Sequence, residues 1–130
     1  MSTVFSKDKL PKDRILYTSK HFRIIADKFP VTPGHLLIIS RNDKRITFFD
    51  LKRKEVAELP DVIHVAKGMI LGSHTPDGWN IGMNCGETAG QTVMHFHCHV
   101  IPRYVGDTEQ PRGGVRGVIE RKRSYSEKSN

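Results

Sequence analysis

The sequence has few cysteines and no long apolar run, and these absences limit what the chain can be. Its two cysteines, Cys85 and Cys98, are too few for the disulfide framework of a small secreted domain. No stretch approaches the roughly 18 apolar residues that a transmembrane helix needs. The polar, lysine-rich start of the chain does not contain the apolar segment of a signal peptide. We therefore expect a cytoplasmic protein with free thiols and no membrane segment.

Basic residues outnumber acidic ones, with 21 Lys and Arg against 14 Asp and Glu, and the net charge is +7. They alternate with acidic residues, and no basic stripe is interleaved with aromatic side chains, which disfavours nucleic acid as a partner. A basic surface that attracts a polyanionic small molecule explains the charge equally well. The 130 residues suffice for one hydrophobic core and contain no internal repeat. We expect a single domain over residues 1–130, with its core in 14–119 and a flexible tail in 120–130.

Hydrophobic periodicity divides the chain into strands and one long helix. Alternating or short apolar runs predict strands at 14–17, 21–26, 35–40, 79–84 and within 92–104. Between the third and fourth strands, apolar residues recur at helical spacing: Leu59, Val62, Ile63, Ala66, Met69 and Ile70. We expect Asp50 to cap this helix and Pro60 to kink or split it near Leu59. The order predicts an α+β fold with one antiparallel sheet covered by the helix.

Three histidines, His95, His97 and His99, alternate with apolar residues in the last predicted strand. Side chains on a strand alternate between its faces, so the three imidazoles should share one face while the residues between them face the core. Three interpretations are open: a hydrated sheet face, a metal site, and nucleophilic catalysis by one imidazole that its neighbours orient. No Cys-x-x-Cys pair and no nearby carboxylate support the metal site, and three histidines in strict alternation are unusual for a hydrated face.

The segment His95-Phe96-His97-Cys98-His99-Val100-Ile101 resembles the signature of the histidine triad (HIT) family, His-φ-His-φ-His-φ-φ, where φ is apolar. Further stretches in the expected order are similar to the same family: PVTPGHLLIIS at 30–40 and NCGETAGQTVMH at 84–95. The stretches IPRYVGD at 101–107 and PRGGVRGVI at 111–119 resemble its fragile-histidine-triad and diadenosine tetraphosphate hydrolase branch. The resemblance implies an antiparallel sheet of about five strands with one long helix and a short one, in a homodimer.

The resemblance also implies a reaction and its catalytic residues. His97 would be the nucleophile that forms a nucleotidyl-histidine intermediate, and His99 would hydrogen-bond the phosphate or assist the leaving group. His95 and His35 would fix the orientation and tautomer of the nucleophile. A neutral imidazole with a pKa near 6.5 is nucleophilic at pH 7, which suits this chemistry.

Candidate substrate-binding residues follow from the same matches. Asp27 would accept from the ribose hydroxyls, and Asn84, Gln91 and Thr92 would contact phosphate or ribose. Arg112 and Arg116, around the paired glycines of PRGGVRG, would bring guanidinium groups to a polyphosphate or would shape a dimer contact. No metal ligand on the protein is implied, although Mg²⁺ carried by the substrate would neutralise phosphate charge. The favoured function is cleavage of dinucleoside polyphosphates such as diadenosine tetraphosphate at the α-phosphate. The alternatives are hydrolysis of nucleoside phosphoramidates and a nucleotide-binding signalling module with little turnover.

Overall fold

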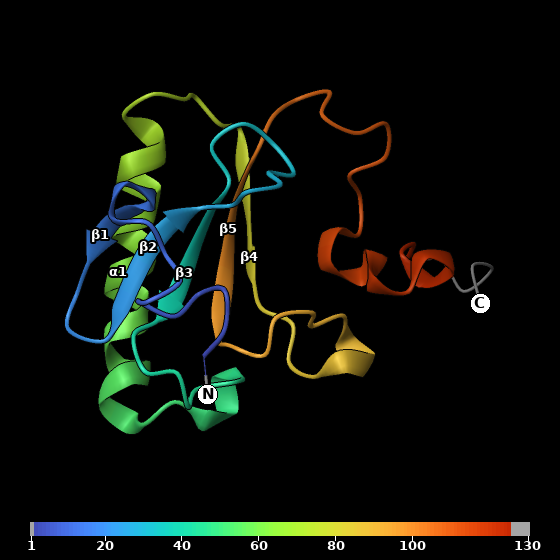
Figure 1. Cartoon of the computed structure of the whole chain (residues 1–130). Helices are drawn as coiled ribbons and strands as arrows, with labels where there is room; N and C mark the ends of the chain where they lie inside the picture. The colour runs from blue at the N-terminus through green and yellow to red at the C-terminus, as the bar shows by residue number, and fades with distance from the viewer. Residues whose placement is uncertain (1, 126–130) are drawn as a thin grey trace.

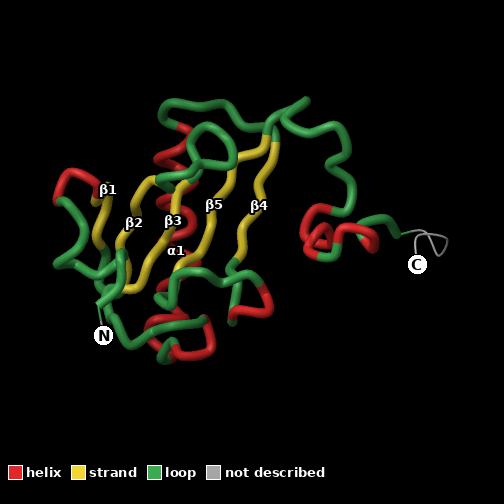
Figure 2. The backbone as a smooth tube through the Cα atoms, turned by 45° about the vertical axis from the view of Figure 1, so that its right-hand side comes forward, coloured by secondary structure: helices red, strands yellow, loops and turns green. Residues whose placement is uncertain are grey.

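The computed structural model describes residues 2–125 and consists of one sheet backed by one α-helix (Figures 1 and 2). The strands are β1 (Ile15–Thr18), β2 (Phe22–Ala26), β3 (Leu36–Ser40), β4 (Gly78–Gly82) and β5 (His97–Arg103), and the helix is α1 (Arg53–Leu71). Short 3-10 helices are η1 (Lys12–Arg14), η2 (Phe48–Asp50), η3 (Glu87–Ala89), η4 (Gly114–Val118) and η5 (Glu120–Lys122). The five strands lie in the order β1-β2-β3-β5-β4 and every neighbouring pair is antiparallel. The predicted α+β class and the single antiparallel sheet are confirmed.

One face of the sheet packs against α1 and forms the larger core. The helix contributes buried residues at helical spacing, and the strands contribute every second residue. These residues are Leu59, Val62, Ala66 and Ile70 of α1, Phe22 and Ile24 of β2, Leu36 and Ile38 of β3, and Cys98 and Val100 of β5. Burial raises the pKa of the Cys98 thiol to about 11, so Cys98 stays protonated and packs as a small apolar side chain, as predicted.

The start of the helix differs from the prediction. Asp50 does not cap α1: it ends η2, where its carboxylate accepts hydrogen bonds from the backbone N–H groups of Ile46 and Thr47. The helix begins three residues later, and Glu55 accepts from the Lys52 N–H at 2.6 Å and from Arg45 Nε at 2.7 Å. The Glu55 carboxylate therefore supplies negative charge to the first turn of α1, beside the basic residues Arg53 and Lys54.

Pro60 does not split the helix, which runs without a break from Arg53 to Leu71. Proline removes one backbone donor and crowds the preceding turn. Here Pro60 lies on the exposed side of α1, directly after the buried Leu59. The contacts of the buried side with the sheet hold the helix together across this position.

The second face of the sheet is partly covered by the start of the chain, in which no element was predicted. Phe5 and Leu10 are buried and pack on Ile25, Leu37 and Ile39 of β2 and β3. We call residues 2–10 the N-terminal segment. It covers His95 and contacts His97, and it leaves His99 half-buried on the β5 side of this face.

Residues 104–125 leave the sheet and form an arm that stands away from the strands (Figures 1 and 2). The predicted tail overlaps this arm, since Glu120–Lys122 form η5. Residues 126–130 of the predicted tail lie outside the described residues. Among residues 2–125, no helix is both long enough and apolar enough to cross a membrane.

Candidate active site

The candidate site lies on the sheet face opposite α1, where β5 places His97 and His99. His97 lies opposite Ile39 of β3, and His99 lies between Leu37 of β3 and Gly82 of β4. Gly82 has no side chain beside His99, which leaves room next to that imidazole. The residues between the histidines face the core with α1, as predicted.

His95 differs from the other two histidines because it lies before β5 rather than in it. It precedes the first residue of β5, and its ring is completely buried beneath the N-terminal segment. Its Nε2 lies 2.8 Å from the carbonyl oxygen of Ser40 and its Nδ1 lies 2.9 Å from Thr3 Oγ1. Because a carbonyl only accepts, Nε2 carries the proton and Nδ1 accepts from the threonine hydroxyl. Burial lowers the pKa of His95, which favours this neutral form.

The tautomer of His97 is fixed by the backbone. Its Nδ1 lies 2.8 Å from the carbonyl oxygen of His95, so Nδ1–H donates and the lone pair is on Nε2. Phe5 packs edge-on against the ring with centroids 5.1 Å apart, which holds its plane. An imidazole with one nitrogen tied to a carbonyl and the other free is prepared for nucleophilic attack.

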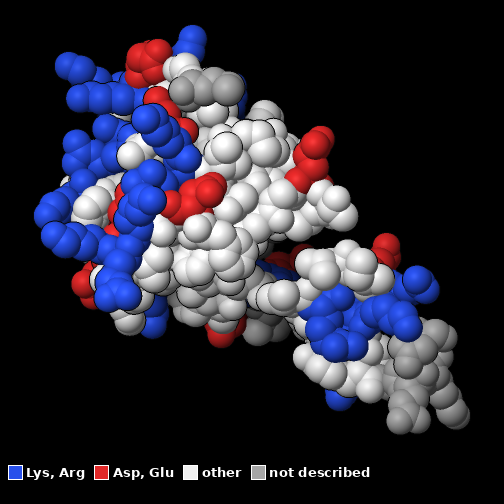
Figure 3. All heavy atoms as spheres, turned by 90° about the horizontal axis from the view of Figure 1, so that it is seen from below, with Lys and Arg blue, Asp and Glu red and all other residues white. Residues whose placement is uncertain are grey.

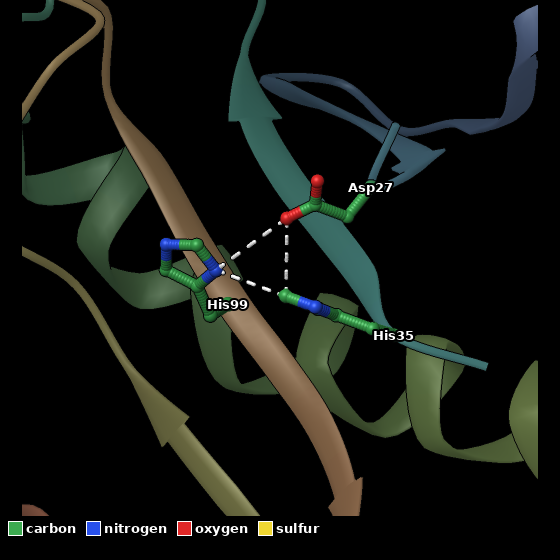
Figure 4. A group of neighbouring side chains, drawn as sticks. All are labelled: Asp27, His35 and His99. Carbon is green, nitrogen blue, oxygen red and sulfur yellow. Dashed lines mark hydrogen bonds and ion pairs between the residues drawn. The ribbon is translucent and has the colours of Figure 1, made fainter. Parts of the chain in front are cut away.

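A second chain of hydrogen bonds orients His99. The Val31 N–H donates to Nδ1 of His35 at 3.0 Å, so the proton of the neutral His35 ring is on Nε2. That Nε2 lies 3.0 Å from Nδ1 of His99, which accepts, and 3.4 Å from Oδ2 of Asp27. Figure 4 shows the three side chains converging, with the other ring nitrogen of His99 directed away from them. In neutral His99 that nitrogen carries the proton and can donate it to a ligand.

The ring of His35 therefore lies against His99 rather than His97. His35 was expected to orient the nucleophile, but the direct hydrogen bond to His97 comes from the His95 carbonyl. Burial, and then the charges of His97 and His35, lowers the pKa of His99 to about 4, and burial also lowers the pKa of His35. Both rings are neutral at pH 7.

Asp27, His35 and His99 also have the composition of a metal site, because three of their ligand atoms lie within 4.8 Å of one another. Ligand atoms around a tetrahedral zinc ion lie about 3.3 Å apart. A metal would, however, take the lone pair of His35 Nε2, whereas the Val31 hydrogen bond places the proton there. The hydrogen bonds of the protein favour a proton relay over a metal centre at this cluster.

A pocket of about 450 Å³ opens in front of His97 and His99. Of the predicted binding residues, Asp27, Asn84 and Thr92 line it. Asp27 uses Oδ1 to accept from the Phe29 N–H at 2.8 Å and turns Oδ2 toward the histidines. Two cations that the sequence did not single out, Arg14 and Lys28, also line this pocket.

Gln91 and the two arginines are not brought to the pocket. Gln91 is buried, with its Oε1 bound to the Gly86 N–H and its Nε2 donating to the carbonyls of Ile46 and Val93. The hydrogen bonds of its amide therefore fix the conformation of the loop before β5. Arg116 lies in the arm, where it donates to the Lys122 carbonyl and stacks on Tyr125. Arg112 lines a different hollow of the same arm.

The N-terminal segment contributes to this site in a way that the sequence did not predict. Val4 and Phe5 form one wall of the pocket, and Thr3 holds His95. The only signal in the sequence was the isolated apolar pair Phe5 and Leu10 in a polar stretch, which is too short for a periodicity argument.

His97 and His99 lie side by side at one pocket, which is the arrangement that the alternation of histidines with apolar residues predicts for the histidine triad. The chain belongs to the histidine triad family, whose HIT domain model matches residues 9–106. Among curated relatives, the nitrilase and fragile histidine triad fusion protein NitFhit of Caenorhabditis elegans is 34% identical over 105 residues, which are 79% of this chain and 23% of that protein. The bis(5'-adenosyl)-triphosphatase of Saccharomyces cerevisiae is 30% identical over 102 residues, 75% of this chain and 50% of the enzyme. The chain thus spans half or less of these relatives.

Solved structures agree in fold. The crystal structure of C. elegans NitFhit superposes with a TM-score of 0.70 at 33% identity, covering 89% of this chain and 27% of that one. A HIT family protein from Bacillus anthracis superposes with a TM-score of 0.69 at 33% identity, covering 77% of this chain and 70% of that one. The predicted family and its fold are confirmed.

Thr3→Val is expected to lower the free energy of unfolding by about 1–2 kcal/mol, because it leaves the buried Nδ1 of His95 without a donor. Thr3→Ser keeps the hydroxyl and should stay close to wild type. Urea unfolding of the three proteins tests this. A Thr3→Val protein as stable as Thr3→Ser would show that the hydrogen bond to His95 contributes nothing.

Acid is expected to destabilise the fold through His99. In the unfolded chain His99 binds a proton as the pH falls below about 6.5, whereas in the folded chain its pKa is about 4. Between about pH 6.5 and pH 4 the unfolded state binds more protons than the folded state, so the free energy of unfolding falls as the pH drops through this range. At pH 5 the expected loss is about 2 kcal/mol. Unfolding free energies of wild type and His99→Gln at pH 5 and 7 measure it. An equal loss in the glutamine variant would assign the effect to other groups.

Proposed function

We propose that the protein hydrolyses dinucleoside polyphosphates, with diadenosine triphosphate and tetraphosphate as model substrates. The observation that carries this proposal is the state of His97: its Nδ1–H is bound to the His95 carbonyl, and its free Nε2 lines a pocket next to neutral His99. The yeast relative named bis(5'-adenosyl)-triphosphatase supports this class of substrate.

In the proposed reaction, His97 Nε2 attacks the α-phosphorus of the bound nucleotide. A P–N bond forms, and the P–O bond to the bridging oxygen breaks. The Nε2–H of neutral His99 donates a hydrogen bond to the leaving oligophosphate or to a phosphate oxygen, the oligophosphate leaves as an anion, and the hydrogen bonds of His35 and Asp27 hold His99 in place. Water then attacks the phosphorus, its proton passes to the departing mononucleotide or to solvent, the P–N bond breaks to restore neutral His97, and the mononucleotide leaves.

The charges of the pocket fit a polyphosphate. Arg14 and Lys28 line the pocket. We assign to them the neutralisation of phosphate charge that was predicted for Arg112 and Arg116. The apolar residues Val4, Phe5 and Phe29 suit a nucleobase, and Asp27 with Asn84 suits the ribose. Mg²⁺ that enters with the substrate would add to this neutralisation.

A turnover assay on diadenosine triphosphate, diadenosine tetraphosphate and an adenosine phosphoramidate, each with and without Mg²⁺, tests the proposal. Release of a mononucleotide from the dinucleotides, faster than from the phosphoramidate, is the expected result. Preference for the phosphoramidate would move the protein to the other predicted substrate class. Tight nucleotide binding with no turnover on any of the three would leave a binding module.

We also propose a cytoplasmic homodimer. Strand β4 is at the edge of the sheet, and Ile81 is 44% exposed on it, next to the arm with its exposed Val115 and Val118. An unpaired edge with apolar neighbours is suited to a second copy. The free thiols of Cys85 and Cys98 suit a reducing compartment. Light scattering after size-exclusion chromatography measures the mass, and a monomer at micromolar concentration would contradict the dimer.

A further inference from the structure

A second hollow lies at the end of the sheet where β1 turns into β2 and where β3 ends, beside the first turn of α1. It is an open groove of about 800 Å³, and none of its lining residues also lines the histidine pocket. Cationic side chains surround it: Lys7 of the N-terminal segment, Lys20 of the β1–β2 turn, Arg23 of β2 and Arg41 after β3. In Figure 3, which views the molecule from below, Lys and Arg gather on this side with a few acidic side chains among them.

Arg23 is the unusual member of this groove. It is only 5% exposed, yet its Nη1 is buried without a hydrogen-bond partner among the described residues. In the part of the chain that the structure describes, Arg23 forms no ion pair within 4 Å. The carboxylates of Glu55, Glu58 and Asp107 pair with other side chains. A buried guanidinium without an anion is costly, and proteins keep such groups where something binds them. Burial and then the charge of Arg41 lower the pKa of Arg23, and the opposing charge of Asp43 does not offset them.

The neighbouring cations are held in place without being neutralised. Arg41 Nη1 donates to the carbonyls of Ser19 and Lys20 at 3.0 and 3.1 Å, which fixes its guanidinium over the β1–β2 turn. Of the three carboxylates at the groove, Glu55 is bound by Arg45 and the Lys52 N–H, Asp8 accepts from Ser2, and Asp43 acts on Arg23 through its charge. Four cations line the groove, and Glu55 is paired with Arg45 outside it, so the charge that remains favours an anion.

We propose that this groove is a second anion site, separate from the histidine pocket, which binds a small phosphate-bearing anion with an oxygen on the guanidinium of Arg23. A phosphate group matches the planar donor fork of arginine, and several cations around one arginine suit its multiple charge. A compact anion also fits better than an extended polyanion, because Asp8 and Asp43 lie at the groove and would repel a chain of phosphates laid across it.

Titration of ¹⁵N-labelled protein with inorganic diphosphate at constant ionic strength tests the proposal. We expect saturable shifts of the amides of Lys20, His21 and Arg41, apart from any shifts at Asn84 and Thr92 in the histidine pocket. Arg23→Met should abolish the groove shifts and keep those of the pocket. Arg53→Gln removes an exposed cation outside the groove and should change neither.

Two further readouts keep the test decisive. Lys20→Gln, an exposed position, should weaken diphosphate binding about threefold or more, and it serves if Arg23→Met does not fold. Without added anion, Arg23→Met should have a higher Tm than wild type, and diphosphate should raise the Tm of wild type alone. The proposal is overturned if the wild-type groove amides do not shift up to about 10 mM diphosphate. It also fails if Arg23→Met or Lys20→Gln leaves the groove shifts unchanged, or if only a single-stranded oligonucleotide binds there.

Discussion

His97→Asn is expected to lose turnover of a dinucleoside polyphosphate by about 10⁴-fold or more while nucleotide affinity stays within a few fold. Asparagine removes the Nε2 lone pair that would attack phosphorus. Its side-chain amide can still donate to the His95 carbonyl, now 2.8 Å from Nδ1, so the local structure should persist. A large loss in kcat with little change in nucleotide Kd is the signature of a group that acts in the chemical step.

Steady-state kinetics and equilibrium binding of the same substrate analogue measure the two quantities. His64→Asn is the matched control, because His64 is exposed on α1 and far from the pocket lining. Rapid denaturation during turnover should trap an acid-labile nucleotidyl adduct on wild type and none on His97→Asn. A variant that keeps more than about a tenth of the activity would exclude His97 as the nucleophile.

Phe96→Ala is expected to lower the free energy of unfolding by about 3–5 kcal/mol, the largest loss of stability that we predict. Phe96 is 1% exposed and packs on Phe22 of β2 with ring centroids 5.9 Å apart, in the core between the sheet and α1. Alanine would leave a cavity that the surrounding strands and helix cannot fill. Because Phe96 stands between His95 and His97, the cavity should also loosen the carbonyl that orients the nucleophile.

Urea unfolding compares Phe96→Ala with Phe49→Ala, in which the ring is 81% exposed and the expected change is below about 1 kcal/mol. The activity of the Phe96 variant should fall further than its folded fraction alone explains. Equal stabilities of the two variants would mean that the core collapses around the missing ring.

The sequence predicted the parts of the site that depend on alternation. The two faces of β5 follow from a period of two, so the separation of Phe96 from His97 could be read without a structure. The alternation did not reveal that β5 begins at His97 and that His95 is buried beneath residues 2–10. That arrangement depends on a contact across 92 positions, between Thr3 and His95, which no local pattern encodes.

Other differences arose where tertiary packing outweighed local preference. Asp50 has the chemistry of a helix cap, but the chain used it for η2 and let Glu55 satisfy the start of α1. Gln91 matched a substrate-binding position by motif, yet its amide is fully used inside the protein. Arg116 was selected for its charge, and the path of the arm determined where that charge lies.

The N-terminal segment has one further consequence, for how members of this family diverge. The shared domain begins at residue 9, whereas Val4 and Phe5, which wall the pocket, come before it. In the proposed function, Val4 and Phe5 contact the nucleobase, whereas the histidines lie inside the matched domain. We therefore expect substitutions at these two positions to change which nucleobase the site accepts while the reaction stays the same.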